Sequence, residues 1–231
     1  MSIQAVLFDL DNTLTHRGQS IIAYSQFLAQ HYAAQLLEMD LPKIQRIINC
    51  IDNGGYPKKE KLTHPSIGAS VAYALLQELH WKTVPDLKEL SAFWFEYFGR
   101  HAVAMPGAEF LLQNLKQKRY KLAVISNGGH ATRLNILQGL GFTHYFDEIV
   151  SSELAGISKP EPEIFLQASA KLGIAPERCL FIGDHPVNDV QGALGAGMQA
   201  ILLEGFHLAD TDQLMVSNRI QQLDQIWTFL G

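Results

Sequence analysis

The chain has 231 residues, of which 47% are hydrophobic and 18% are charged, a composition typical of a globular protein with a buried core. Its net charge of -5 gives no general attraction to nucleic acid or to an anionic membrane, so we expect neither as a partner. No apolar run approaches the roughly 20 residues of a membrane span, no secretory-signal pattern opens the chain, and the cytoplasm is the expected location.

The first predicted element is a short apolar segment, residues 3–8, which runs into two aspartates and is typical of a buried parallel strand. The next part of the chain lacks such segments. Asp40 before Leu-Pro predicts a helix N-cap, and the glycines and prolines of residues 52–66 predict a loop. Apolar residues recur at helical spacing over residues 20–39, 41–51, 67–80 and 86–99.

The rest of the chain alternates between strand-like and helix-like segments. Buried strands are predicted at residues 121–126, 148–151, 179–183 and 199–203. Helices are predicted at residues 106–118, 131–138, 162–172 and 187–196, and a last helix at 220–230 is expected to pack on the sheet. Such alternation predicts right-handed crossovers and a doubly wound α/β parallel sheet. We therefore expect a Rossmann-like α/β core, residues 1–15 and 101–231, with an inserted α-helical domain, residues 16–100.

Both cysteines are expected to be packed as thiols. Cys179 lies in an apolar strand and Cys50 follows a helical pattern. Neither has the spacing of a metal site or of a disulfide framework.

Polar residues follow several predicted strands at the point where each ends. In an open parallel sheet these ends form the ligand-binding edge. Four separated segments deliver carboxylates, a lysine and hydroxyl or amide groups to this edge. The side chains are Asp9, Asp11, Thr13, Ser126, Asn127, Lys159, Asp184 and Asp189.

Several converging carboxylates cannot all stay ionised without a counter-charge. A hard divalent cation with oxygen ligands supplies that charge, and magnesium (Mg2+) suits a site that combines a few carboxylates with phosphate oxygens. Lys159 would add a second positive charge, while Ser126 and backbone N–H groups would hold phosphoryl oxygens. The pattern therefore indicates magnesium-dependent chemistry on a small phosphorylated molecule.

At these residues the sequence resembles the haloacid dehalogenase (HAD) superfamily. Its four motifs are matched in order by Asp9–Leu14, Ser126–Gly128, Lys159-Pro160 and Gly183-Asp184 with Asp189. Any one of these matches would be weak, but the four together cover residues 5 to about 203. Lys-Pro-Glu-Pro-Glu-Ile-Phe and Gly-Asp-His-Pro-Val-Asn-Asp-Val-Gln-Gly-Ala resemble the branch that carries a helical cap after the first motif. The insert at residues 16–100 stands where that cap would be.

The resemblance implies a phosphatase whose catalytic residues are Asp9, Asp11 and Lys159. Asp9 would attack phosphorus and form an aspartyl-phosphate. Asp11 would give a proton to the leaving oxygen and then accept one from the hydrolytic water. Lys159 would hold the transferring phosphoryl group.

The resemblance also implies the binding residues. Asp9 and Asp184 would bind magnesium through their side chains, and Asp11 through its backbone carbonyl. Asp189 would support the metal shell or pair with Lys159. Substrate binding is assigned to Ser126, Asn127 and Thr13, the last by orienting the turn that carries the two aspartates.

Asp11 separates two reaction classes within this resemblance. Dehalogenases lack an acid at that position because a halide leaves without a proton, whereas an alkoxide leaving group benefits from one by about 10²–10⁴-fold. Asn12 stands where many sugar-phosphate members have Gly, which disfavours a mutase. The alternatives are a phosphotransferase or phosphomutase of the same chemistry, and a non-catalytic protein that binds a phosphorylated metabolite. The sequence names neither the substrate nor the oligomeric state.

Several polar residues outside the motifs have a structural interpretation that we favour. His16 and Arg17 are expected in a solvated linker, although they could reach the substrate, and His130 is expected at a helix start, although it could lie near the phosphate. His185 is given no role. Lys58, Lys59, Lys61 and His64 are expected in a solvated loop, although they could contact an anionic leaving group. The aromatic residues of the fourth predicted helix, Phe93, Trp94, Phe95, Tyr97 and Phe98, are expected to pack in a core.

Overall fold

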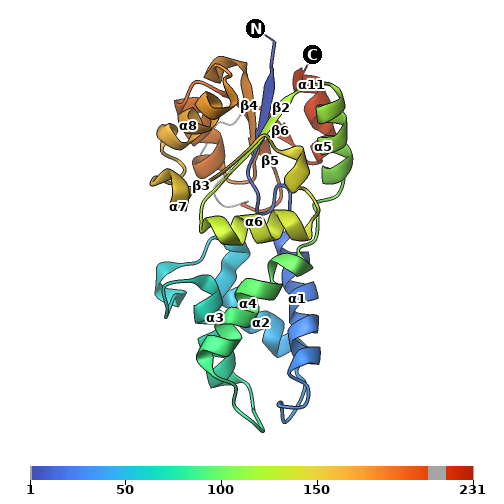
Figure 1. Ribbon diagram of the computed structural model, residues 1–231, viewed down its shortest axis with the longest axis vertical. Helices are drawn as coiled ribbons and strands as arrows, with labels where there is room; N and C mark the ends of the chain where they lie inside the picture. Colours follow the sequence, from blue (N-terminus) through green and yellow to red (C-terminus); the bar gives the residue numbers. More distant parts are fainter. Residues whose placement is uncertain (1, 208–216, 231) are drawn as a thin grey trace. The chain divides into compact units, whose positions relative to one another are not determined.

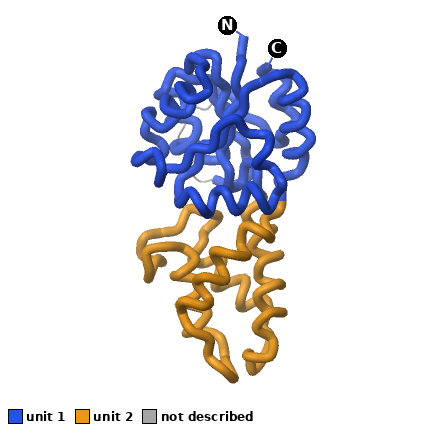
Figure 2. Tube along the Cα trace, viewed as in Figure 1, with its two compact units in different colours: residues 1–15, 104–231 blue, residues 16–103 orange. Residues whose placement is uncertain are grey.

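The structure, a computed structural model, describes residues 2–207 and 217–230 (Figure 1). The chain divides into two compact units (Figure 2). We call residues 1–15 with 104–231 the core unit and residues 16–103 the helical unit. The second boundary falls at residue 103, whereas the sequence placed it at residue 100. Thr15 forms an antiparallel bridge with Ala104, and this pairing sets where the chain returns to the core unit.

The core unit contains a six-stranded sheet in the order β3-β2-β1-β4-β5-β6, and every neighbouring pair is parallel. The strands are β1 (Ala5–Phe8), β2 (Lys121–Ser126), β3 (Glu148–Ser151), β4 (Cys179–Gly183), β5 (Gln199–Leu203) and β6 (Arg219–Ile220). The predicted doubly wound α/β fold is confirmed. The chain first adds β2 and β3 on one side of β1. It then crosses to the other side of β1, where β4 pairs with it. The strand order therefore reverses beside β1, at the point where such sheets bind ligands.

Helices cover both faces of the sheet, as Figure 1 shows for α5 and α11 on one side and α7 and α8 on the other. Because side chains alternate along a strand, each strand contributes to both layers. Leu7, Ile125 and Phe181 pack with Phe165 of α8 in one buried cluster. The helical elements are α5 (Ala108–Gln117), α6 (His130–Gly139), η4 (Thr143–Tyr145), α7 (Ser152–Ala155), α8 (Pro162–Leu172), η5 (Pro176–Arg178), η6 (Pro186–Gln191), α9 (Gly192–Gly195), η7 (Leu223–Ile226) and α11 (Trp227–Leu230).

Two predicted helices of the core unit differ from the structure. The segment predicted as one helix over residues 187–196 is a π-helical turn, η6, followed by α9. The predicted tail helix over residues 220–230 begins instead as strand β6, because Arg219 and Ile220 pair with Leu202 and Leu203 at the sheet edge. A strand of two residues leaves no periodic pattern that sequence could reveal.

The helical unit contains the four expected helices, α1 (Arg17–His31), α2 (Leu41–Asp52), α3 (Ile67–Glu78) and α4 (Leu87–Tyr97), with the short turns η1 (Asn53–Gly55), η2 (Lys59–Lys61) and η3 (Gly99–His101). Asp40 is the N-cap of α2, as predicted, and accepts a hydrogen bond from the Lys43 N–H at 2.9 Å. The first helix ends at His31 instead of continuing to residue 39, because Leu36 leaves it to form a bridge with Trp81. Among the described residues, no helix combines the length and apolarity of a membrane span.

Aromatic side chains form the core of the helical unit. Tyr24 of α1 contacts the rings of Phe93, Trp94 and Phe98 at centroid distances of 6.2, 5.0 and 5.6 Å. These rings are buried, as predicted, but Phe95 is 42% exposed and lies outside this core. The loop lysines Lys58, Lys59 and Lys61 are exposed, and His64 is half-buried beside Tyr73.

The sequence suggested that Arg17 lies in a solvated linker, but the structure shows Arg17 buried in the helical unit. Its Nη2 donates to Asp52 Oδ1 at 2.5 Å, and its guanidinium lies 4.5 Å from the centre of the Phe98 ring. Asp52 Oδ2 also accepts the Gly55 N–H at 3.0 Å, so the ion pair ties the start of α1 to the end of α2. The partners are 35 residues apart, and no local sequence pattern marks such a pair.

Replacing Asp52 by Ala is expected to lower the free energy of unfolding by about 3–5 kcal/mol, because the buried Arg17 guanidinium would lose its carboxylate partner. Urea denaturation of the two proteins measures the difference. Asp86→Ala is the matched control, because Asp86 is also an N-cap carboxylate but is exposed; its loss should be about 1 kcal/mol. Equal losses in the two variants would contradict a special role for the buried pair.

The two cysteines differ in exposure. Cys179 is buried in β4, as predicted, whereas Cys50 is exposed and the prediction that it is packed is wrong. The apolar face of α2 is formed by Ile44, Ile47, Ile48 and Ile51, and Cys50 lies off that face.

A thiol reagent at neutral pH is expected to modify one cysteine per folded chain. Burial, with a smaller effect of Glu177, raises the pKa of the Cys179 thiol to about 11, so this thiol stays protonated as well as covered. Mass spectrometry after labelling should place the modification on Cys50, and both thiols should react in denaturant. Labelling of Cys179 in the folded protein would contradict this expectation.

Candidate active site

The candidate site lies at the carboxyl ends of β1 and β4. Asp9 follows β1 and donates its N–H to Ile182 of the neighbouring β4 at 2.9 Å, so Asp9 and Asp184 leave adjacent strands. Lys159 comes from the segment between α7 and α8, and Asp189 comes from η6. The sheet thus brings together three carboxylates and one ammonium from segments far apart in the sequence.

Lys159 joins two of these carboxylates. Its Nζ donates to Asp9 Oδ1 and to Asp189 Oδ1, both at 2.6 Å. All three side chains are at least 96% buried. Of the two roles predicted for Asp189, the structure therefore shows the pairing with Lys159. The second oxygen of Asp189 accepts the His185 N–H at 2.9 Å.

A glycine makes room for Asp189. A side chain at Gly183 would collide with the Asp189 carboxyl group. The Asp189 and Val190 N–H groups both donate to the His185 carbonyl, and His185 Nδ1 accepts from Val187 and Asn188. This turn points the Asp189 carboxylate at the end of β4, where it meets Lys159.

The turn after β1 is held by one backbone carbonyl. Leu10 accepts from the N–H groups of Leu14 and Thr15 at 3.0 and 2.9 Å. Asn12 has a φ of 59°, in the left-handed region that Asn and Gly tolerate best. Thr13 is buried, but its hydroxyl has no hydrogen-bond partner among the described residues. Thr13 takes part in the turn through its N–H, which donates to the Leu10 carbonyl at 3.4 Å, and its orienting role stays a prediction.

Asn127 fixes the position of Lys159. Its Oδ1 accepts the Lys159 N–H at 2.9 Å, and its Nδ2 donates to the Lys159 carbonyl at 3.0 Å. Both ends of the amide are thus engaged with the Lys159 backbone. The structure thus shows that Asn127 positions Lys159, while its contact with substrate stays a prediction.

The charges of the site shift its ionisation. Burial raises the pKa of the Asp9 carboxyl group well above its ordinary value, and the neighbouring aspartates raise it further, while Lys159 opposes them. Burial would lower the pKa of Lys159, but Asp189 and Asp9 outweigh burial and raise it. Burial likewise raises the pKa of Asp184, against a hydrogen bond from His207 that lowers it. Lys159 therefore stays charged, and its one positive charge does not balance the three carboxyl groups of Asp9, Asp184 and Asp189.

The residues present fit a divalent cation. Carboxylate oxygens of Asp9, Asp184 and Asp189 lie within 4.8 Å of one another, and all three residues are buried. Asp9 Oδ2 is buried with no hydrogen-bond partner among the described residues, an arrangement that costs stability unless a cation occupies it. Both oxygens of Asp189 are already engaged, so Asp9 and Asp184 are the better ligands. An all-oxygen donor set suits magnesium.

The structure adds two residues that the sequence analysis missed. Arg133 of α6 donates from Nη1 to Asp11 Oδ2 at 2.5 Å and to Ser126 Oγ at 3.3 Å. His207 lies with its Nε2 at 3.1 Å from Asp184 Oδ2. The rule that ligands bind at the carboxyl ends of strands, applied to β5, would have pointed to His207. The sequence gives a weaker indication for Arg133, which is only a charged residue near the start of the helix that follows β2.

Two other polar residues, His130 and His16, have structural contacts outside the carboxylate cluster. His130 begins α6, as predicted; its N–H donates to Glu153 Oε2 at 2.8 Å and its Nδ1 lies 3.3 Å from Ser151 Oγ. His16 is the N-cap of α1 in the helical unit.

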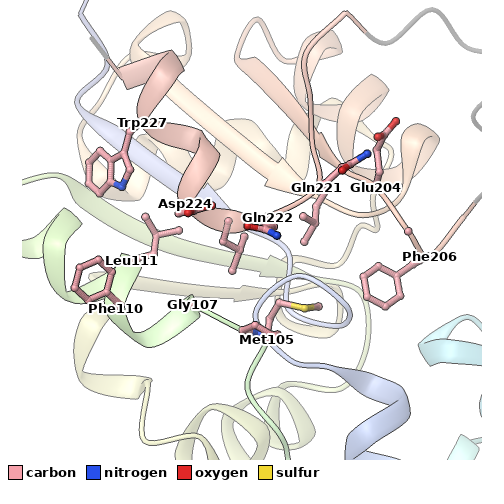
Figure 3. A pocket seen from close by; sticks show the side chains of 14 residues that line it. Met105, Gly107, Phe110, Leu111, Glu204, Phe206, Gln221, Gln222, Asp224 and Trp227 are labelled. Carbon is pink, nitrogen blue, oxygen red and sulfur yellow. The ribbon is translucent and has the colours of Figure 1, made fainter.

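A separate cavity of about 660 Å³ lies elsewhere in the core unit. Figure 3 shows Trp227 and Phe110 on one side of it and Met105 and Phe206 on the other. None of the predicted site residues lines this cavity. The carboxylate cluster therefore marks the candidate site, and the cavity does not.

Comparison with known proteins agrees with the motifs. The family described as haloacid dehalogenase-like hydrolase matches residues 3–197. Glyceraldehyde 3-phosphate phosphatase from Methanothermobacter thermautotrophicus is 42% identical over 98 residues, an alignment that covers 42% of this chain and only 43% of that protein. The protein of the same name from Methanopyrus kandleri is 28% identical over 208 residues, which cover 86% of this chain and 83% of that one.

Among solved structures, the HAD-hydrolase YfnB from Bacillus subtilis, determined with magnesium bound, matches with a TM-score of 0.74. The match covers 100% of both chains at 20% identity. Similarity at that level of identity establishes the shared fold.

Proposed function

Because this chain belongs to the haloacid dehalogenase-like hydrolase family, we propose that it is a magnesium-dependent phosphatase that hydrolyses a small phosphorylated metabolite through Asp9. One observation carries the proposal. Asp9 is held by Lys159 through Oδ1, while its Oδ2 has no hydrogen-bond partner within residues 2–207 and 217–230. This oxygen is thus available for a cation or for phosphorus. Asp11, two residues later, can give a proton to the leaving oxygen of a phosphate ester, whereas a halide leaves without a proton.

The proposed reaction has two steps. A carboxylate oxygen of Asp9 attacks phosphorus, the ester P–O bond breaks, and the leaving oxygen takes a proton from Asp11. Water then attacks the aspartyl-phosphate, gives its proton to Asp11, and releases inorganic phosphate with Asp9 restored. Asp9, Asp184 and the Asp11 carbonyl would hold Mg2+, which when bound offsets the charge of the carboxylates and of the phosphate. Lys159 and Ser126 hold the phosphoryl oxygens.

The proposed substrate class is a small phosphorylated metabolite. Relatives named glyceraldehyde 3-phosphate phosphatase support this class. We assign the helical unit the role of a cap that selects the leaving group, by its place in the chain after the first motif. Asn12 has a left-handed backbone, which Asn adopts more easily than most other residues besides Gly, so it is compatible with the turn that Gly forms in many sugar-phosphate members.

A screen of phosphorylated metabolites with magnesium tests the proposal. The panel includes nucleoside monophosphates, sugar phosphates, phosphoglycolate and glyceraldehyde 3-phosphate, and release of inorganic phosphate is measured. Turnover should stop when a chelator removes the metal and return when magnesium is restored. Transfer of phosphate to a sugar hydroxyl instead of water would identify a mutase. Tight binding of one compound without turnover would identify a non-catalytic binding protein.

A further inference from the structure

The aspartates of the candidate site need more positive charge than Lys159 supplies. Asp9, Asp184 and Asp189 are buried at one edge of the sheet, and two of them already share the Lys159 ammonium. A phosphate ester brings further negative charge to this edge. A cation that can follow the phosphoryl group, in addition to Lys159 and the proposed magnesium, would therefore favour binding.

Arg133 is a cation in the right place. Its Nη1 contacts Ser126 Oγ at 3.3 Å, and Ser126 is the hydroxyl assigned to the phosphoryl oxygens. The same Nη1 donates to Asp11 Oδ2 at 2.5 Å, and Asp11 is assigned to the leaving oxygen. The guanidinium thus stands beside the two groups that would lie on either side of the breaking P–O bond.

Arg133 also has hydrogen-bonding capacity that the described residues do not use. Its Nε is buried and has no acceptor among them. A buried donor without an acceptor is unfavourable, and the fixed fork of a guanidinium matches the oxygens of a phosphoryl group. Lys159 donates two of its three N–H groups to Asp9 and Asp189, which leaves one for a phosphoryl oxygen.

Gly128 gives the guanidinium its space. It has a φ of 133°, which L side chains rarely adopt, and a Cβ there would lie 3.0 Å from Arg133 Nη2 and 3.3 Å from Nε. The glycine that follows Ser126 and Asn127 therefore leaves the side chain of Arg133 room against the backbone at the end of β2.

We propose that Arg133 is a substrate-binding residue that exchanges its bond to Asp11 for bonds to the transferring phosphoryl group. This role rests on the proposed phosphatase function. In the exchange Nη1 moves from one oxyanion to another, and Asp11 Oδ2 is released toward the leaving oxygen.

Binding of inorganic phosphate to the whole protein with magnesium, measured by calorimetry, tests the contact without turnover. Arg133→Met should weaken phosphate binding by about 10- to 100-fold, the range for a hydrogen bond between charged groups. Arg133→Lys, which keeps the charge without the fork, should fall between Met and wild type. Arg178→Met is the matched control, because it removes an equal charge at the amino end of β4, opposite Asp184.

Kinetics with two esters separate this role from mere positioning of Asp11. A phosphoryl contact predicts an equal loss of kcat/KM in Arg133→Met for 4-nitrophenyl phosphate and for an alkyl phosphate. A loss confined to the alkyl ester would overturn the proposal, because Arg133 would then act only through Asp11. Unchanged phosphate affinity in a folded Arg133→Met protein, or no phosphate binding by the wild type, would also overturn it. If Arg133→Met does not fold, Arg133→Lys decides by the same measurements. Wild type that binds phosphate but hydrolyses no ester would contradict the phosphatase function and leave the Arg133 contact measurable.

Discussion

Asp9→Asn is expected to reduce turnover of every phosphate ester by roughly 10⁴-fold or more, because a neutral amide does not attack phosphorus. The fold should persist, since the Asn oxygen can still accept from Lys159 Nζ, which donates to Asp9 at 2.6 Å. Acid quenching during turnover of a radiolabelled substrate should trap phosphate on the wild-type chain. The same quench should leave the Asp9→Asn chain unlabelled.

Asp224→Asn is the matched control for this experiment, because Asp224 is an exposed aspartate of the core unit. It should retain both turnover and labelling. Turnover close to wild type in Asp9→Asn would remove Asp9 as the nucleophile. Labelled phosphate recovered from another residue would move the nucleophile to that residue.

Most of the fold could be predicted because the strands are buried on both faces. β2, β4 and β5 occupy the predicted residues because each is a largely apolar run between two helical layers, whereas β3 was predicted from a weaker and partly polar run, Glu-Ile-Val-Ser. β6 could not be predicted because its two residues owe their state to pairing with β5. The π-helical turn of η6 could not be predicted either. It depends on one carbonyl, that of His185, accepting from two successive N–H groups.

The candidate site divides along a similar line. Asp9, Lys159 and Asp189 meet as the motifs suggested, because they lie at the end of a strand or in the segments beside one. Arg133 and His207 were missed because neither lies in one of the four matched motifs, although each contacts a motif aspartate, Asp11 or Asp184. Motif reasoning finds residues whose spacing is fixed locally. A partner that a neighbouring element supplies in space has no fixed spacing to find.

Asp11→Asn is expected to lower kcat/KM by an amount that depends on the leaving group. For an alkyl phosphate the loss should be about 10²–10⁴-fold, because the alkoxide needs a proton as the P–O bond breaks. For 4-nitrophenyl phosphate the loss in the first step should be much smaller, because the phenolate leaves without protonation. Steady-state kinetics with a series of esters of increasing leaving-group pKa measures the dependence directly.

Hydrolysis of the aspartyl-phosphate, the second step of the proposed reaction, gives an independent check of the Asp11 prediction. If Asp11 also accepts the proton of the hydrolytic water, Asp11→Asn should accumulate aspartyl-phosphate with the nitrophenyl ester and show a burst of nitrophenol. Arg133→Met, by contrast, should lower both esters equally. The contact between Arg133 Nη1 and Asp11 Oδ2 makes this comparison informative, because the two variants break the same pair from opposite ends. Equal losses for all esters in Asp11→Asn would show that Asp11 does not protonate the leaving oxygen.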